Sequence, residues 1–162
     1  DGANKFKIRG DFVIHSPMTN DQWKVYDVTY NPQPHPITWT CIGTIPQVKI
    51  EYYSPNQKGG LWWHMIENSW DTTRTGHYNW EVEDDITYGA SAYGAKIRIT
   101  DISHSPQISK ESDGFMIRAN FNIGNPKAND AWIVYHATKQ PNKYDITWDT
   151  AGSVSNVVIE YL

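Results

Sequence analysis

Hydrophobic and polar residues alternate along several short segments of the chain, as they do in β-strands with one buried face. The segment VKIEYY places Val48, Ile50 and Tyr52 on one face. YNWEV, which ends at Val82, and AKIRIT, which ends at Thr100, follow the same period of two, as do the shorter ITW and FKI. Each of these segments is therefore predicted to be a strand.

The stretches between these segments are rich in residues that favour turns: SPMTND, NPQPHP, SPNQKGG and SHSPQ. Leucine occurs only at Leu61 and Leu162, and no apolar stripe with helical spacing runs beyond two turns. Seven or so short strands at this spacing predict an all-β fold, an antiparallel two-sheet sandwich of the immunoglobulin-like kind.

The chain also repeats itself. Residues 1–53 align without a gap on residues 110–162, an offset of 109 residues, and 21 of the 53 pairs are identical where chance gives about three. A unit of this length is too long for a solenoid repeat and suits an independent domain. We therefore predict tandem sandwich repeats whose period equals this offset.

This period divides the chain into three parts: residues 1–10 close a preceding repeat, residues 11–119 form a complete one, and residues 120–162 form the first half of the next. A half sandwich exposes an apolar face and open strand edges. Two explanations are open. The chain is a window of a longer repetitive polypeptide, or the half repeat is completed by an identical subunit through strand addition.

The ordered motifs of one repeat resemble a known family. They are F-x-I-x-x-P-x-x-N-D-x-W-x-V in Phe12–Val25, I-T-W-x-x-x-G-x-x-x-x-V-x-I-E-Y in Ile37–Tyr52, Y-N-W-x-V, A-K-I-R-I-T-D and S-D-G-F. Together they resemble the secreted immunoglobulin-like repeats called the Ser-Thr-rich GPI-anchored or yeast cell-wall-synthesis-type module, many copies of which occur in bacterial surface proteins. The chain departs from the family's S-x-D-G-G loop, where it has Ser54-Pro-Asn-Gln-Lys-Gly-Gly60.

The resemblance implies a non-catalytic extracellular or cell-surface protein, a structural stalk, filament, surface-layer or adhesion repeat, whose partners are neighbouring repeats or identical subunits. An alternative is a carbohydrate-binding module that stacks exposed Trp side chains on a polysaccharide. The net charge of −4, with scattered basic residues, argues against a nucleic-acid partner. No apolar run is long enough for membrane insertion.

Aromatic residues give two sets of candidates. Trp62, Trp63 and Trp70 lie in the densest aromatic region, and Trp62 and Trp63 must face opposite sides of a strand, so one of them is a candidate sugar platform unless it packs on another repeat. The set predicted to define the core combines Trp residues with alternating Ile residues: Trp23, Trp39, Ile50, Trp80, Ile97, Ile99, Trp132 and Trp148.

Polar candidates are few. Glu83, Asp84 and Asp85 form an oxygen-rich cluster that is a candidate calcium site, although consecutive acids are more often a solvated loop, and no other cofactor is expected. Asn20-Asp21 and its counterpart Asn129-Asp130 are expected to form turns through bonds to nearby backbone amides. The six His residues show no metal spacing, and a neighbouring Ser and His in sequence do not make a triad, so no catalytic residue is predicted.

Overall fold

The computed structural model describes residues 8–56, 62–72, 75–138 and 142–162, and within these ranges the protein is all-β. The only helical element described is a short 3₁₀ turn, Gly89–Ser91. The strands are β1 (Asp11–Ser16), β2 (Gln22–Lys24), β3 (His35–Ile42), β4 (Gln47–Tyr53), β5 (Trp63–Asp71), β6 (Thr75–Trp80), β7 (Lys96–Asp101), β8 (Ser109–Glu111), β9 (Met116–Arg118), β10 (Asn120–Asn125) and β11 (Thr147–Ala151).

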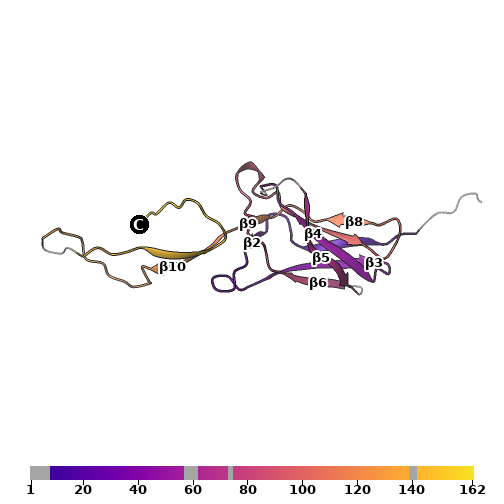
Figure 1. Ribbon diagram of the computed structural model, residues 1–162, viewed down its shortest axis with the longest axis horizontal. Coiled ribbons are helices and arrows are strands. Elements are labelled where there is room, and N and C mark those ends of the chain that lie inside the picture. Colours follow the sequence, from indigo (N-terminus) through magenta and orange to yellow (C-terminus); the bar gives the residue numbers. More distant parts are fainter. Residues whose placement is uncertain (1–7, 57–61, 73–74, 139–141) are drawn as a thin grey trace, which may run out of the picture.

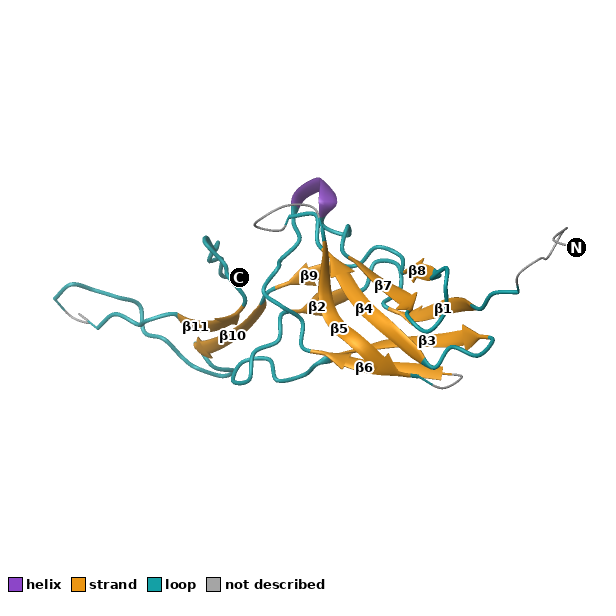
Figure 2. Ribbon diagram, turned by 45° about the vertical axis from the view of Figure 1, so that its right-hand side comes forward, coloured by secondary structure: helices purple, strands orange, loops and turns teal. Residues whose placement is uncertain are grey.

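Two antiparallel sheets form the larger body of the molecule, in the strand orders β1-β3-β6 and β5-β4-β7-β8 (Figure 2). Strands β5 and β6 follow one another along the chain but belong to different sheets, so the chain changes layer between them. The inner faces of the two sheets enclose one hydrophobic core, which Phe12 and Trp39 enter from the first sheet and Ile50 and Ile97 from the second. This arrangement is a β-sandwich.

The alternation of polar and apolar residues predicts the core face of these strands correctly. Val48, Ile50 and Tyr52 of β4 are all buried. The outer face of the same strand is partly closed as well, because Glu51 lies beneath Arg98 at 2.9 Å and Lys49 at 3.1 Å. The alternation therefore identifies the inner face of β4 correctly, while the ion pairs of Glu51 with Arg98 and Lys49 cover the centre of its outer face.

A short parallel pair, β2 with β9, joins the beginning of the body to its end. Trp23 lies opposite Ile117, and the Val25 amide donates to the Arg118 carbonyl oxygen at 2.9 Å. The turn that leads into β2 has Asn20 at φ 65°, and the Asp21 carboxylate accepts a hydrogen bond from the Met18 amide at 2.8 Å. The turn predicted for Asn20-Asp21 is confirmed, since Asn tolerates the left-handed conformation.

Beyond β9 the chain forms a separate hairpin, β10 with β11, which extends away from the sandwich (Figure 1). Its register repeats that of β1 with β3 at the same offset that relates the two sequences: Asp11 pairs with Ile42 and Asn120 with Ala151, and the irregularity falls at the same place. The following turn repeats too, with the Asp130 carboxylate accepting from the Lys127 amide at 2.8 Å.

The hairpin has no second sheet over it among the described residues, and no strand is assigned in residues 152–162. Phe12 is 1% exposed, whereas its counterpart Phe121 is 48% exposed. The prediction that Trp132 and Trp148 are core residues is wrong for this chain, because each is 38% exposed. The other six predicted core residues, Trp23, Trp39, Ile50, Trp80, Ile97 and Ile99, are buried.

Candidate functional site

The sandwich and the β10–β11 hairpin are joined by a polar contact with defined geometry. The Asp84 carboxylate accepts two hydrogen bonds from Ser153, one from its backbone amide at 2.9 Å and one from its hydroxyl at 2.5 Å. Such a two-point bond to a carboxylate fixes orientation as well as distance. Ala151, at the end of β11, is fully buried in this contact region.

Gly152 lets the two bodies approach closely. Its φ is +94°, which favours glycine, and a Cβ there would lie 3.1 Å from the side chains of Val25 and Ile86 and 3.2 Å from the Asp84 carboxylate. Any side chain at this position would be strained and would crowd all three neighbours. In the sequence Ala151-Gly152-Ser153, the alanine is buried, the glycine allows the sandwich to approach closely, and the serine donates two hydrogen bonds to Asp84.

The loop that presents Asp84 is held at both ends by the sandwich. The Tyr26 amide donates to the Val82 carbonyl oxygen at 2.8 Å, and the Thr87 amide donates to the Ile117 carbonyl oxygen at 2.9 Å. Val82 and Thr87 are themselves buried. Asp84 is thus positioned by the β2–β9 end of the sandwich and projects toward the hairpin.

The predicted calcium ligands point to separate partners. Glu83 accepts a hydrogen bond from the Tyr52 hydroxyl at 3.0 Å, and Asp84 is bonded to Ser153. Burial raises the pKa of the Asp85 carboxyl, although a hydrogen bond from Ser54 opposes the shift. Within the described part of the chain, no three His, Cys, Asp or Glu side chains are grouped for a metal ion. The structure does not support Glu83, Asp84 and Asp85 as a calcium site, because the three carboxylates are not grouped, and Glu83 and Asp84 are bonded to Tyr52 and Ser153.

The three candidate sugar-binding Trp side chains have different environments. Trp62 is 63% exposed and precedes β5. Trp63 is half-buried, with the Arg98 guanidinium 4.2 Å from the ring centroid, and Trp70 packs edge-on against Tyr78 with ring centroids 5.0 Å apart. Trp63 and Trp70 stand at opposite ends of β5, about 20 Å apart at the usual rise of a strand. They do not make one stacking platform.

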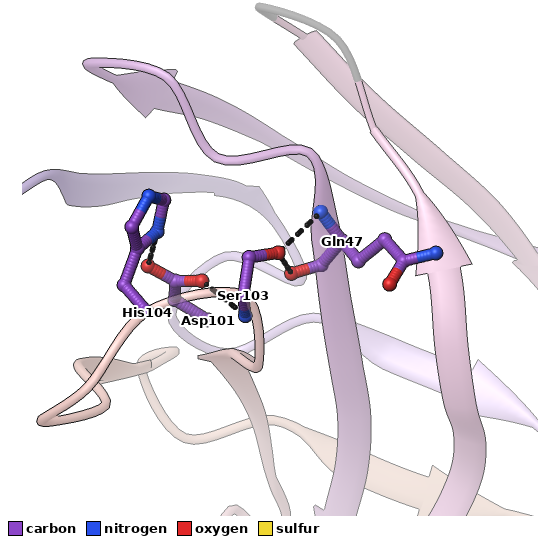
Figure 3. Close-up of polar contacts among 4 residues, drawn as sticks. All are labelled: Gln47, Asp101, Ser103 and His104. Atoms are coloured by element: carbon purple, nitrogen blue, oxygen red, sulfur yellow. Dashed lines mark hydrogen bonds and ion pairs between the residues drawn. The ribbon is translucent and has the colours of Figure 1, made fainter.

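A Ser, a His and an Asp do meet at the end of β7, but in a structural turn (Figure 3). The buried Asp101 carboxylate contacts His104 Nδ1 at 2.8 Å and accepts from the Ser103 amide at 2.8 Å. The Ser103 hydroxyl is directed to the Gln47 backbone, whose amide donates to it at 3.1 Å. A nucleophilic serine needs its hydroxyl on the imidazole, and here the two groups lie on opposite sides of Asp101.

None of the known protein families, curated proteins or solved structures compared with the chain matches it. The function must therefore be argued from the chain's own residues. In the described ranges, no helix has the length and apolar character that crossing a membrane requires.

Sequence reasoning did not single out Ser153 or the role of Asp84 as its partner. The contact spans 69 residues, and both side chains are of types that are common in solvated loops. One signal was available in the internal alignment. Gly152 and Ser153 align with Gly43 and Thr44, which preserves a glycine followed by a hydroxyl residue in both copies.

His35 gives the sandwich a pH dependence. Its ring stacks on Trp23 with centroids 5.0 Å apart, and its Nε2 accepts the Lys24 amide at 3.1 Å, which requires the neutral ring. Burial lowers the pKa of His35, the Asp21 carboxylate opposes the shift, and Lys24 adds to it. The unfolded chain therefore binds more protons, and the free energy of unfolding should fall as the pH drops below about 6.5.

Urea unfolding at pH 7.5 and 5.5 measures this loss. In the variant H35Y the pH-dependent loss should shrink, because the introduced side chain is not an imidazole and carries no proton exchange near neutral pH. A tyrosine suits the position, since the aligned residue Tyr144 stacks on Trp132 in the same way with ring centroids 5.1 Å apart. An equal pH dependence in H35Y and the parent would show that other groups cause it.

Proposed function

We propose that this chain is part of a tandem array of immunoglobulin-like sandwiches that serves as a non-catalytic stalk, filament or surface layer outside the cell. Residues 11–119 are one complete module on this proposal, and residues 120–162 begin the next. The function is mechanical: each module is held at a defined angle to its neighbour by packing and hydrogen bonds at the junction.

The observation that carries the proposal is that the β1–β3 and β10–β11 hairpins have the same strand register. The pairs Ile14 with Trp39 and Ile123 with Trp148 occupy the same register position in their respective hairpins. Residues that follow the same sequence pattern adopt the same strand pairing and the same turns. This supports a second copy of the module rather than an unrelated tail.

The strand order of the sandwich supports the immunoglobulin-like assignment. Three strands in one sheet and four in the other, with sequential strands distributed between both, is an arrangement of the immunoglobulin and fibronectin type III class. The parallel β2–β9 pair closes the sandwich along one side. Because one fold can host many functions, the topology supports only the type of module, and the structural role is argued from the repeat and the junction.

The exposed hairpin face favours completion by further residues of one longer polypeptide over exchange of strands between subunits. In the sandwich, the face of the β1–β3 hairpin is covered by β4, β7 and their neighbours from residues 47–118. Within residues 1–162, the segment left over for strand exchange is residues 1–10, which align with residues 110–119 and correspond to β9 and its flanks. One strand cannot cover a face that takes a whole sheet to bury.

A length series tests the proposal. Chains with one, two or three copies of residues 11–119 ahead of residues 120–162 should show maximum dimensions, measured by small-angle X-ray scattering, that increase by a constant step per copy. A fixed module-to-module contact produces such a rod. Maximum dimensions that rise far less than linearly would contradict a stalk, because they would indicate modules that fold back or tumble on a flexible linker.

A further inference from the structure

The end of the sandwich opposite to the hairpin presents an exposed surface, Ile42, Gly43 and Thr44, which we call the entry surface. It begins at the last residue of β3, and this end of β3 lies on the side of the sandwich away from β10 and β11 (Figure 2). Ile42 is 53% exposed although it closes a strand, and a groove of about 590 Å³ runs beside it between Thr40 and Thr72.

The entry surface has the chemistry of the junction already formed at the other end. Gly43 has φ +90° and Gly152 has φ +94°, and each follows the last residue of an equivalent strand. Thr44 aligns with Ser153 and carries the same two donors, a backbone amide and a hydroxyl. A Cβ added at Gly43 would have the Gly10 backbone, at 3.4 Å, as its nearest heavy atom. Gly43 therefore has no counterpart of the Val25 and Ile86 side chains that lie against Gly152, and this side of Gly43 is open.

The partner of the Ala151-Gly152-Ser153 turn belongs wholly to the sandwich, since Val25, Asp84 and Ile86 all lie within residues 11–119. Every copy of the module therefore carries both halves of the contact, one at each end. The link into the two hairpins also matches: Arg9-Gly10 precedes β1 as Arg118-Ala119 precedes β10. A preceding copy of the module would therefore be linked to β1 in the same way as the sandwich is linked to β10.

We propose that the entry surface binds the Asp84 loop of a preceding copy of this module, with that copy's Asp84 carboxylate accepting hydrogen bonds from the Thr44 amide and hydroxyl. The inference rests on the proposed tandem array and specifies its joint. Ile42, the counterpart of the fully buried Ala151, is covered by that copy, and Gly43 lies against that copy's Val25 and Ile86 as Gly152 does at the other end.

Disulfide trapping in a tandem chain tests the joint. Residues 11–119 are placed ahead of residues 11–162, with Cys41 replaced by Thr, its aligned residue, in both copies. D84C in the first copy and T44C in the second form the test pair. D84C and S153C, both in the second copy, form the positive control, and D84C in the first copy with exposed H77C in the second forms the negative control.

The test pair should oxidise to an intramolecular disulfide at a rate within about tenfold of the positive control, as thiols held at bonding distance do. The result that would overturn the proposal is oxidation of the positive control while the test pair reacts no faster than the H77C pair. The maximum dimensions in the length series could still increase by a constant step per copy in that case. The two experiments therefore distinguish an incorrect module-to-module contact from an incorrect function.

A second measurement avoids the cysteines. I42N in the second copy should lower the midpoint temperature of the tandem chain by several degrees. It should leave that of the single chain of residues 1–162 nearly unchanged, because Ile42 is exposed there and asparagine places no charge opposite Asp11. Equal midpoint changes in the two chains would contradict the docking of Ile42.

Discussion

Replacing Trp39 by alanine is expected to lower the free energy of unfolding by about 3–5 kcal/mol, because it removes a large side chain from a core that cannot collapse around the space. Trp39 is 1% exposed and stands in the central strand of its sheet, between β1 and β6. Urea unfolding followed by circular dichroism measures the loss without depending on the tryptophan removed.

The chain contains a matched control in Trp148, the aligned residue of the second ITW motif. Because Trp148 is 38% exposed, W148A should cost about 1 kcal/mol or less. In a chain extended after Leu162 by a second copy of residues 54–119, the second sandwich would be complete, and W148A should then cost about as much as W39A. A small cost of W148A in that extended chain would contradict the tandem-module proposal.

The variant G76A is expected to destabilise the sandwich by about 3 kcal/mol or more, a large effect for a single methyl group. Gly76 in β6 pairs directly with Trp39 in β3, and the indole lies across the glycine. A Cβ at this position would fall 1.8 Å from Trp39 Cε2 and 2.0 Å from Cζ2. Because Trp39 is 1% exposed within the core, a shift of the ring or of the strand disturbs the packing around it.

A double-mutant cycle isolates this cause. When W39A is already present, G76A should cost close to nothing, since the atoms that collide with the new methyl group are gone. H77A, the exposed neighbour on the other face of β6, is the local control and should change stability by about 0.5 kcal/mol or less. Additive costs for W39A and G76A would mean that the backbone at Gly76, and not the indole, demands glycine.

The alternating segments predict the inner faces of the strands well because the strand period is a local property. Tyr78, Trp80 and Val82 alternate with exposed Asn79 and Glu81 as YNWEV predicts. Glu51 shows the limit of that logic. Its position on the polar face of β4 predicts exposure, yet Lys49 from the same strand and Arg98 from the neighbouring β7 cover it. The alternation within β4 does not show that Arg98 lies opposite Glu51.

The candidate site was predicted less well than the fold. The acidic residues 83–85 and the Trp residues 62, 63 and 70 were chosen because they cluster along the chain. The structure gives Glu83, Asp84, Trp63 and Trp70 four different partners. Ser153 became significant only through Asp84, which is remote in sequence. Clustering in sequence shows what a loop contains and says little about where its side chains point.

The sequence by itself determined strands β3, β4, β6 and β7 with their inner faces, the Asn-Asp turns and the offset of the internal repeat. Each of these depends on neighbouring residues or on direct comparison of two segments. The strand predicted for FKI falls mostly outside the described residues. Only the tertiary structure decided that one ITW tryptophan is buried and the other exposed, that Gly76 lies under an indole, and that Asp84 fastens Ser153. The physical reason is that burial and such contacts depend on which distant strands pack over a residue. Identical local sequences can therefore have different environments.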